Sequence, residues 1–143
     1  MRYCTGMAIG TYDLFHVGHL FFLKKASELC SRLIVAVDSD ERVFEYKGHY
    51  PIIPVEQRMT IVSSIKCVDT VIRNDTGYGA DRWKQYNIDV IFIGNNWEQN
   101  REWKNKESYL KENGIDTVYI PSTSGVSTTL IIQQIIAQAK FRK

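Results

Sequence analysis

Five short apolar runs, separated by segments of helical periodicity, constrain the fold of this chain most strongly. The runs cover residues 7–9, 33–37, 68–72, 88–93 and 117–120, and most of them are rich in β-branched residues. Strands that alternate with helices are typical of a parallel sheet joined by right-handed crossovers. The sequence therefore predicts an α/β fold: a Rossmann-like, doubly wound, five-stranded parallel sheet with helices on both faces.

Apolar residues at helical spacing predict helices over residues 22–30, 55–65 and 130–138. A short helix is expected over residues 80–86, and charged, helix-forming residues ending before Gly114 predict an exposed helix over residues 98–113. Residues 41–54 show neither period, and Gly48, Pro51 and Pro54 predict a long, mobile loop there. The chain has 143 residues and shows no repeat or linker. We therefore expect a single domain over residues 1–143.

Charge and composition exclude several classes of partner. Hydrophobic residues make up 44% of the chain and charged residues 24%, as in ordinary globular proteins. The formal net charge of +2 comes from 18 basic and 16 acidic residues, which argues against a nucleic-acid backbone as the main partner. Any anion that this chain binds is therefore expected to be small.

The cysteines and the apolar runs bear on the compartment. Cys4, Cys30 and Cys67 are odd in number and lie within or beside apolar runs, which indicates buried, reduced thiols. No apolar stretch has the length of a membrane-spanning helix, and the N-terminus lacks the pattern of a signal peptide. We expect a cytoplasmic protein with no membrane insertion.

Residues 8–19 read as a strand end, a polar turn and the start of a helix. Such a unit brings free N–H groups and the positive end of a helix dipole to the carboxyl edge of the sheet, where phosphates bind. Gly18 removes a side chain where a ligand can approach the backbone. This turn is therefore the first candidate for an anion site.

His16 and His19 lie three residues apart, so they share one side of the first helical turn. They could simply cap the helix. They could also bind a metal with Asp13 as a third ligand, although no cysteine or further histidine lies at ligand spacing. A third possibility is that imidazolium donors stabilise charge on a phosphoryl group. The pair alone leaves these alternatives open.

Other polar strand ends are expected at the same edge of the sheet. These are the ends at Asp38-Ser39 and Gly94-Asn95, together with the helix start at Ser127-Thr128. Simple helix capping is an equally good interpretation of Ser127-Thr128. Trp97 could stack on a base or pack against the sheet.

Three motifs together resemble the cytidylyltransferase family, within the HxGH-type nucleotidyltransferase superfamily. They are Gly10-Thr11-Tyr12-Asp13-Leu14-Phe15-His16-Val17-Gly18-His19, then Lys47-Gly48 followed by Pro54 and Arg58, and finally Gly125-Val126-Ser127-Thr128-Thr129. By size and motif the chain is most similar to bacterial glycerol-3-phosphate cytidylyltransferases. The resemblance covers nearly the whole chain.

The resemblance implies a reaction between CTP and a small phosphorylated alcohol, such as glycerol 3-phosphate. The phosphate of the alcohol would attack the α-phosphorus in line, giving a CDP-alcohol and pyrophosphate without a covalent enzyme intermediate. It also implies Mg²⁺ held largely by phosphate oxygens and water, and a homodimer. Whether the protein itself supplies a metal ligand is left unassigned.

The resemblance also implies roles for individual residues. The expected catalytic residues are Asp13, His16, His19 and Lys47, with the histidines donating to the α- and β-phosphates, Lys47 reaching from a mobile loop, and Asp13 ordering the turn or the metal-bound nucleotide. The expected nucleotide-binding residues are Gly10, Thr11, Tyr12, Gly18, Gly94, Asn95, Ser127, Thr128 and Thr129. Arg58, Lys66 and Trp97 are expected to bind phosphate or the acceptor.

Three positions depart from the family pattern. Lys66 and Ser122 stand where the family usually has arginine, and Asn95 stands where it usually has aspartate. Lysine lacks the bidentate fork of arginine, serine lacks its charge, and asparagine presents both a donor and an acceptor. These departures affect the identity of the base and of the acceptor more than the reaction itself.

Several alternatives therefore stay open. The acceptor could be phosphocholine, phosphoethanolamine or another polyol phosphate, and a choline group would call for an aromatic cage. The shared first motif permits an adenylyltransferase. The chain could also be a nucleotide-binding regulator without catalysis, although Asp13, His16, His19, Lys47 and Ser127 argue against it.

Overall fold

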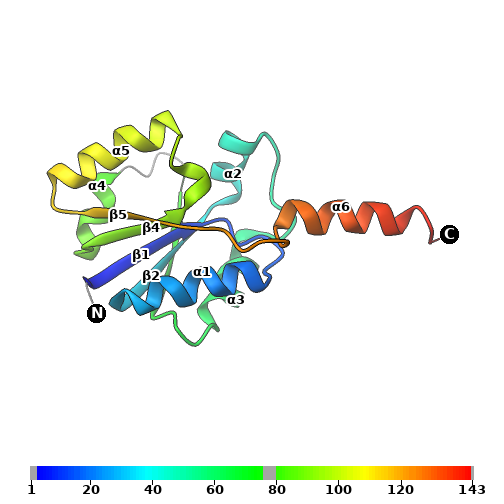
Figure 1. Ribbon diagram of the computed structural model, residues 1–143, viewed down its shortest axis with the longest axis horizontal. Coiled ribbons are helices and arrows are strands. Elements are labelled where there is room, and N and C mark those ends of the chain that lie inside the picture. The colour runs from blue at the N-terminus through cyan, green and yellow to red at the C-terminus, as the bar shows by residue number, and fades with distance from the viewer. Residues whose placement is uncertain (1–2, 76–79, 143) are drawn as a thin grey trace.

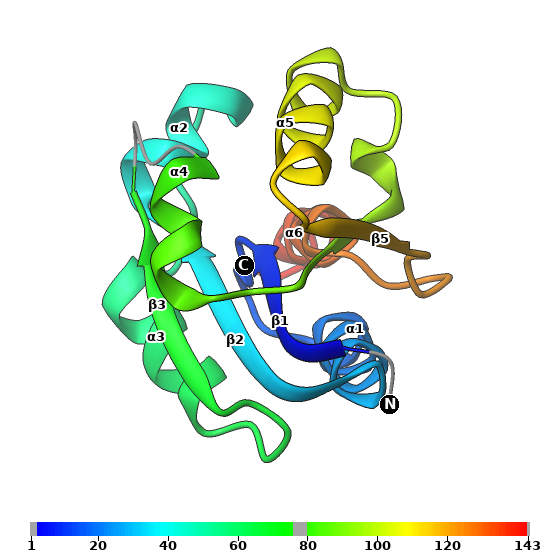
Figure 2. The same ribbon diagram turned by 90° about the vertical axis from the view of Figure 1, so that its left-hand side faces the viewer.

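The structure is a computed structural model that describes residues 3–75 and 80–142. It contains one parallel sheet with the strand order β3-β2-β1-β4-β5 (Figures 1 and 2). The strands are β1 (Tyr3–Gly10), β2 (Cys30–Asp38), β3 (Thr70–Asn74), β4 (Val90–Gly94) and β5 (Asp116–Ile120). The predicted doubly wound, five-stranded parallel sheet is confirmed.

Helices cover both faces of this sheet (Figure 1). They are α1 (Val17–Glu28), α2 (Asp40–Lys47), α3 (Val55–Ser63), α4 (Ala80–Trp83), α5 (Arg101–Glu112) and α6 (Thr128–Ala139), with the short 3₁₀ turns η1 (Lys84–Tyr86) and η2 (Asn95–Trp97). Alternate residues of each strand point to opposite faces, so Met7 joins the core under α4 and α5 while Ala8 joins the core under α1 and α3. No helix in the described ranges is long and apolar enough to cross a membrane.

The chain adds β2 and β3 on one side of β1 and then crosses back to add β4 and β5 on the other side, so the direction of the strand order switches between β1 and β4. A ligand cleft is expected outside the carboxyl ends of the strands at such a switch point. The turn after β1, the start of α2 and the end of β4 all lie there. The topology therefore brings together the polar strand ends that the sequence singled out.

The prediction of a loop over residues 41–54 is wrong for its first half, which forms α2. Ser39 caps this helix by accepting a hydrogen bond from the Arg42 N–H at 3.1 Å, and Gly48 ends it with φ = 77°. Val43 supplies the one buried side chain of α2. The caps at both ends therefore stabilise this helix more than burial does. Because its sequence has almost no hydrophobic periodicity, the pattern of apolar residues does not predict it.

Two smaller expectations also change. The helix predicted over residues 98–113 begins only at Arg101, because Asn100 caps it by accepting from the Trp103 N–H at 2.9 Å. All three cysteines are free, but only Cys30 is buried as expected, whereas Cys67 is half-buried and Cys4 is exposed.

Arg58 of α3 ties together the segments that form the floor of the cleft. Its side chain is fully buried and donates from Nε to the Ile53 carbonyl at 2.7 Å. Nη1 donates to the carbonyls of Thr11 at 2.6 Å and Asp38 at 2.8 Å, and Nη2 donates to Asp40 Oδ1 at 2.7 Å. One guanidinium therefore joins the turn after β1, the end of β2, the start of α2 and the loop before α3.

We expect Arg58→Ala to lower the free energy of unfolding by about 3 kcal/mol or more, because it leaves buried acceptors unpaired and Asp40 without its partner. Urea denaturation measures this loss. The matched control is Arg73→Ala, which removes an exposed ion pair with Asp75 and is expected to change stability by less than about 0.5 kcal/mol. Equal losses in the two variants would contradict the role assigned to Arg58.

Candidate functional site

Two adjoining cavities open at the carboxyl edge of the sheet. Cavity A has a volume of about 340 Å³ and lies between the turn after β1, the end of β4 and residues 120–129. Cavity B has a volume of about 250 Å³ and lies over the ends of β1 and β2, between α2 and the aromatic side chains of α4 and α5. The residues that line both are Ile9, Gly10, Thr11, Lys47, Asn96 and Trp97. The two cavities are therefore parts of one site.

The two histidines of cavity A form a capping box at the start of α1. His16 is the N-cap, and its Nδ1 accepts from the Gly18 N–H at 3.1 Å. His19 Nδ1 accepts from the His16 N–H at 3.2 Å, and the two rings stack with centroids 3.8 Å apart. Because Nδ1 accepts in both rings, the hydrogen-bond network assigns the proton of each neutral ring to Nε2. Capping and donation to a ligand thus use different nitrogens.

Both rings are neutral near pH 7. Burial, followed by the electrostatic effects of the His16 ring and of Lys47, lowers the pKa of His19 to about 3. Burial also lowers the pKa of His16. Any donation from these rings therefore comes from neutral imidazoles through Nε2–H, and not from the imidazolium groups that were one of the alternatives left open by the sequence.

The start of α6 meets the start of α1 across cavity A. Ser127 caps α6 by accepting from the Leu130 N–H at 3.1 Å. Thr128 Oγ1 donates to the Asp13 carbonyl at 2.8 Å and lies 3.4 Å from His16 Nε2. Thr129 also lines the cavity. The cavity therefore has a hydroxyl-bearing helix N-terminus on one side and an imidazole-bearing one on the other.

The turn between β1 and α1 is strained and tightly packed. Tyr12 and Leu14 have φ values of 58° and 50°, in the left-handed region that residues other than glycine rarely adopt. A Cβ on Gly18 would lie 2.9 Å from His16 Cε1 and 3.1 Å from Val126 Cγ1. Glycine at this position therefore makes room for the His16 ring and for Val126, in addition to any ligand.

Asp13 supports a loop. Its carboxylate accepts from the backbone N–H groups of Ile52 at 2.8 Å and Ile53 at 2.9 Å. Residues 3–75 and 80–142 contain no group of three or more His, Cys, Asp or Glu side chains that could hold a metal ion. Both carboxylate oxygens of Asp13 are already engaged, which favours its expected role in ordering the turn.

Lys47 is the last residue of α2, so the expected placement on a mobile loop is corrected. Its exposed side chain lines both cavities, and Nζ lies 5.8 Å from the centroid of the Tyr46 ring. Trp97 also lines both cavities and meets the Tyr46 ring edge-on, with centroids 5.3 Å apart. Lys47 is thus the basic side chain at the junction of the two cavities.

Three expected site residues do not line either cavity. Arg58 is buried beneath the site, where backbone carbonyls and Asp40 occupy its donors. Lys66 is exposed in the turn before β3, at the opposite edge of the sheet. Asn95 is exposed as well, and Asn96 lines the site instead.

The one-residue difference between Asn95 and Asn96 follows from η2. This 3₁₀ turn begins directly after β4, and the Asn96 side chain folds back over Gly94. A Cβ on Gly94 would lie 2.7 Å from Asn96 Oδ1. Gly94 therefore lets this amide reach the cavity.

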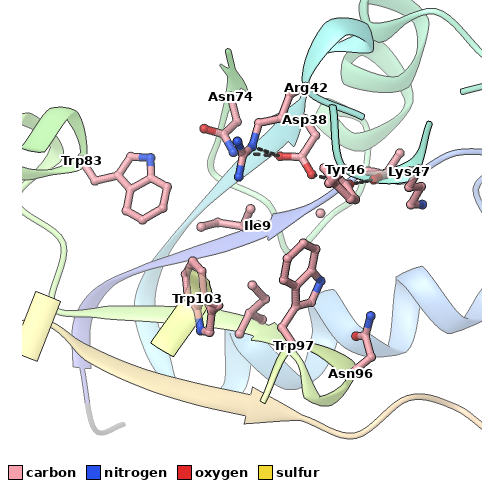
Figure 3. Close-up of a pocket in the computed structure, with 13 residues that line it drawn as sticks. Ile9, Asp38, Arg42, Tyr46, Lys47, Asn74, Trp83, Asn96, Trp97 and Trp103 are labelled. Carbon is pink, nitrogen blue, oxygen red and sulfur yellow. Dashed lines mark hydrogen bonds and ion pairs between the residues drawn. The ribbon is translucent and has the colours of Figure 1, made fainter. Parts of the chain in front are cut away.

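Cavity B contains a buried polar cluster, of which the sequence singles out only Asp38 (Figure 3). Asp38 Oδ1 accepts from Asn74 Nδ2 at 2.8 Å, and Asp38 Oδ2 accepts from the Tyr46 hydroxyl at 2.9 Å. Arg42 Nε lies 3.7 Å from Asp38 Oδ1. Burial raises the pKa of Asp38, while Asn74, Arg42 and Tyr46 oppose this shift. Arg42 and Tyr46 lie four residues apart, which is a helical spacing within the segment expected as a loop.

The comparisons with known proteins agree with this geometry. A family model described as cytidylyltransferase-like matches residues 7–134. The chain is 35% identical over 130 residues to a glycerol-3-phosphate cytidylyltransferase from Staphylococcus aureus, covering 88% of this chain and 90% of the relative. It is 34% identical over 142 residues to an FAD synthase from Thermococcus sibiricus, covering 95% and 93%.

A similar solved structure is that of a lipopolysaccharide core biosynthesis protein from Thermoplasma volcanium. It has a TM-score of 0.69 and 26% sequence identity, and the match covers 85% of this chain and 97% of that one. With the matched family model and the strand order described above, these similarities show that the chain belongs to the cytidylyltransferase-like family of the nucleotidyltransferase superfamily.

Proposed function

We propose that this protein transfers a cytidylyl group from CTP to a small phosphorylated alcohol, with glycerol 3-phosphate as the first acceptor to test. The products are a CDP-alcohol and pyrophosphate. The observation that carries the proposal is the placement of two neutral Nε2–H donors, a second helix N-terminus and Lys47 around one cavity. The activity named for the S. aureus relative supports the choice of nucleotide and acceptor.

In this proposal the triphosphate of CTP binds in cavity A. The Nε2–H groups of His16 and His19 donate to the α- and β-phosphates, and the free N–H groups at the start of α6 bind the far end of the triphosphate. The donors are already fixed by their Nδ1 hydrogen bonds, so little reorganisation is needed as charge develops. The chain thus contributes position and electrostatic stabilisation.

The acceptor phosphate lies at the junction of the cavities, near Lys47 and Thr11, and attacks the α-phosphorus in line. No cysteine is among the described lining residues of either cavity, and the Ser127 hydroxyl is engaged in capping α6. Direct attack without a covalent enzyme intermediate agrees with these contacts.

Mg²⁺ would neutralise charge on the triphosphate. The described residues offer it no cluster of acidic ligands, which fits an ion held mainly by phosphate oxygens and water. We also propose a homodimer, since α6 exposes Leu130, Ile135 and Ile136, which a second copy could cover. The free cysteines support a cytoplasmic location as part of the same proposal.

Adenylyl transfer is the second candidate, and the similarity to the FAD synthase favours it. Asn96 lines the site with an amide that offers both a donor and an acceptor, so it can pair with an edge of cytosine or of adenine. A nucleotide-binding regulator without turnover is the third.

Pyrophosphate release, measured with each of the four NTPs against several phosphorylated alcohols and FMN, separates these functions. We expect turnover with CTP and a phosphorylated alcohol. Preference for ATP would replace the cytidylyl proposal with adenylyl transfer. Tight nucleotide binding without turnover for any pair would leave only the regulator.

The two nitrogens of His19 can be tested separately. His19→Asn keeps an acceptor near the Nδ1 position, so the cap of α1 persists, but it removes the Nε2–H donor. We expect kcat to fall by roughly 100-fold, as for the loss of a transition-state donor, with little loss of stability. His19→Gln is the matched variant, because its amide can supply an N–H donor in place of Nε2–H, and glutamine at the third helical position can also accept from the His16 N–H.

The expected order of kcat is wild type, then His19→Gln, then His19→Asn, whereas both variants keep a cap and should stay close to the wild type in stability. A kcat of His19→Asn close to that of the wild type would show that His19 acts only through the cap. Steady-state kinetics measures kcat, and urea denaturation of the same preparations measures the free energy of unfolding.

The neutral state of His19 predicts a pH dependence of stability. The pKa of His19 is lowered from 6.5 to about 3 in the folded protein, so between these values the unfolded chain binds the additional proton. The stabilisation is thus fully present above about pH 6.5 and is lost progressively as the pH falls toward 3. Urea denaturation at pH 7.5 and pH 5.5 measures the loss. His19→Asn should show a smaller difference, and an identical difference would contradict a buried, neutral His19.

A further inference from the structure

The Tyr46 side chain lines cavity B beside Lys47 (Figure 3). Its hydroxyl donates to Asp38 Oδ2 at 2.9 Å and lies 2.7 Å from Thr11 Oγ1. Asp38 Oδ1 accepts from Asn74 Nδ2 at 2.8 Å. A continuous chain of hydrogen bonds therefore runs from the buried end of β3 to the hydroxyl of Thr11, which lines both cavities.

The direction of this chain follows from the protons that its members carry. A tyrosine hydroxyl has one proton, and burial together with the charge of Asp38 raises the pKa of Tyr46, so the proton stays on its oxygen. Because Tyr46 gives this proton to Asp38, its oxygen can only accept from Thr11. The Thr11 hydroxyl therefore donates to Tyr46 and has only lone pairs left for the junction of the cavities.

The surroundings of Asp38 set this direction. Burial raises the pKa of Asp38, but its neighbours Asn74, Arg42 and Tyr46 oppose the shift. Asn74 Nδ2 and Arg42 Nε can only donate, so Asp38 Oδ1 has to accept. An ionised carboxylate accepts at Oδ2 as well, which makes Asp38 the accepting end of the chain.

An acceptor at Thr11 matches the donor that lies beside it. Lys47 follows Tyr46 as the last residue of α2, and its Nζ lies 5.8 Å from the centroid of the Tyr46 ring, within the range of a cation–π contact. An ammonium group only donates, whereas the oxygens of a phosphate anion accept. Thr11 Oγ1 therefore attracts Lys47 and repels a phosphate oxygen, which leaves the contact with phosphate to Lys47.

We propose that Tyr46 is a positioning residue for the transfer reaction: its hydroxyl fixes Thr11 as a hydrogen-bond acceptor, and Thr11 and the Tyr46 ring together hold the Lys47 ammonium at the junction of the cavities. The inference rests on the proposed function and assigns how its basic side chain is held. A lysine is a point charge on a flexible stem, so fixing it in place costs conformational entropy. Contacts that fix it before substrate binds lower this cost in the transition state.

Tyr46→Phe removes the hydroxyl and keeps the ring. Thr11 is then free to donate to a phosphate oxygen, so we expect kcat to fall about 5- to 10-fold while KM for glycerol 3-phosphate stays the same or falls. Tyr50→Phe is the matched control, because Tyr50 is exposed and lines neither cavity A nor cavity B, and it should change neither parameter. An unchanged kcat in Tyr46→Phe, or a kcat that falls only together with a rise in KM, would overturn the inference.

A double-mutant cycle with Thr11→Val tests whether Tyr46 acts through Thr11. If it does, Tyr46→Phe should change kcat by less than about twofold once Thr11 is valine, because the hydroxyl has no remaining partner to fix. Thr11→Ser keeps the hydroxyl and should keep the full effect of Tyr46→Phe. Losses that simply multiply in the double variant with Thr11→Val would show independent roles and would overturn the inference.

Asp38→Asn tests the direction of the chain while keeping its shape. The oxygen of the new amide has to face Asn74 and Arg42, which only donate, so its N–H faces Tyr46. Tyr46 then donates to Thr11, and the Thr11 hydroxyl turns its proton toward the junction, where it opposes an ammonium group. We expect kcat to fall about 5- to 10-fold, as in Tyr46→Phe, and a kcat equal to that of the wild type would overturn the inference.

Threonine methyl NMR of the free protein keeps the two proposals distinguishable. Three-bond couplings should report one Thr11 rotamer in the wild type and an average of rotamers in Tyr46→Phe, with the signal assigned by its loss in Thr11→Val. One rotamer in both proteins, with turnover by the wild type, overturns the inference and leaves the proposed function standing. Averaging in Tyr46→Phe, without turnover of any nucleotide by the wild type, supports the link from Tyr46 to Thr11 and overturns the proposed function.

Discussion

The buried guanidinium of Arg58 holds together the parts of the chain from which the site is built. It donates to two strand-end backbone carbonyls, one loop carbonyl and one carboxylate, all at 2.6 to 2.8 Å. These acceptors belong to segments that are far apart in sequence and would otherwise be surface turns. Arg58, which the sequence presents as a candidate phosphate-binding residue, therefore stabilises the cleft from inside the protein.

A second set of contacts aligns the two helix starts in cavity A. The Thr128 hydroxyl donates to the Asp13 carbonyl beside His16, while the Asp13 carboxylate holds Ile52 and Ile53. In the turn after β1, Asp13 therefore contacts α6 through its backbone carbonyl and the loop before α3 through its carboxylate. The separate capping hydrogen bonds at the start of α1 fix the protonated nitrogen of each histidine, so the direction of donation is set before a ligand binds.

The sequence predicts the doubly wound parallel sheet, because the strands and helices follow from local periodicity. It also predicts most of the residues that line cavity A, because parallel strands end at a common edge of the sheet. It does not predict α2, where Val43 is the single buried residue and capping by Ser39 supplies the rest. It places Asn95 in the site, although the turn after β4 presents Asn96 instead. It also cannot distinguish a buried arginine from a ligand-binding one, since the partners of Arg58 are mostly backbone carbonyls that carry no sequence signal.

Helix α6 shows how such a site and its scaffold depend on one another. It begins in cavity A, leaves the body of the molecule (Figure 1), and has no buried residue over its 12 residues. An isolated helix of this length is only marginally stable in water, so its order depends on its N-terminal hydrogen bonds. An anion bound at that end favours the helical state through the dipole. The helical order of the C-terminal segment should therefore report whether the cavity is filled.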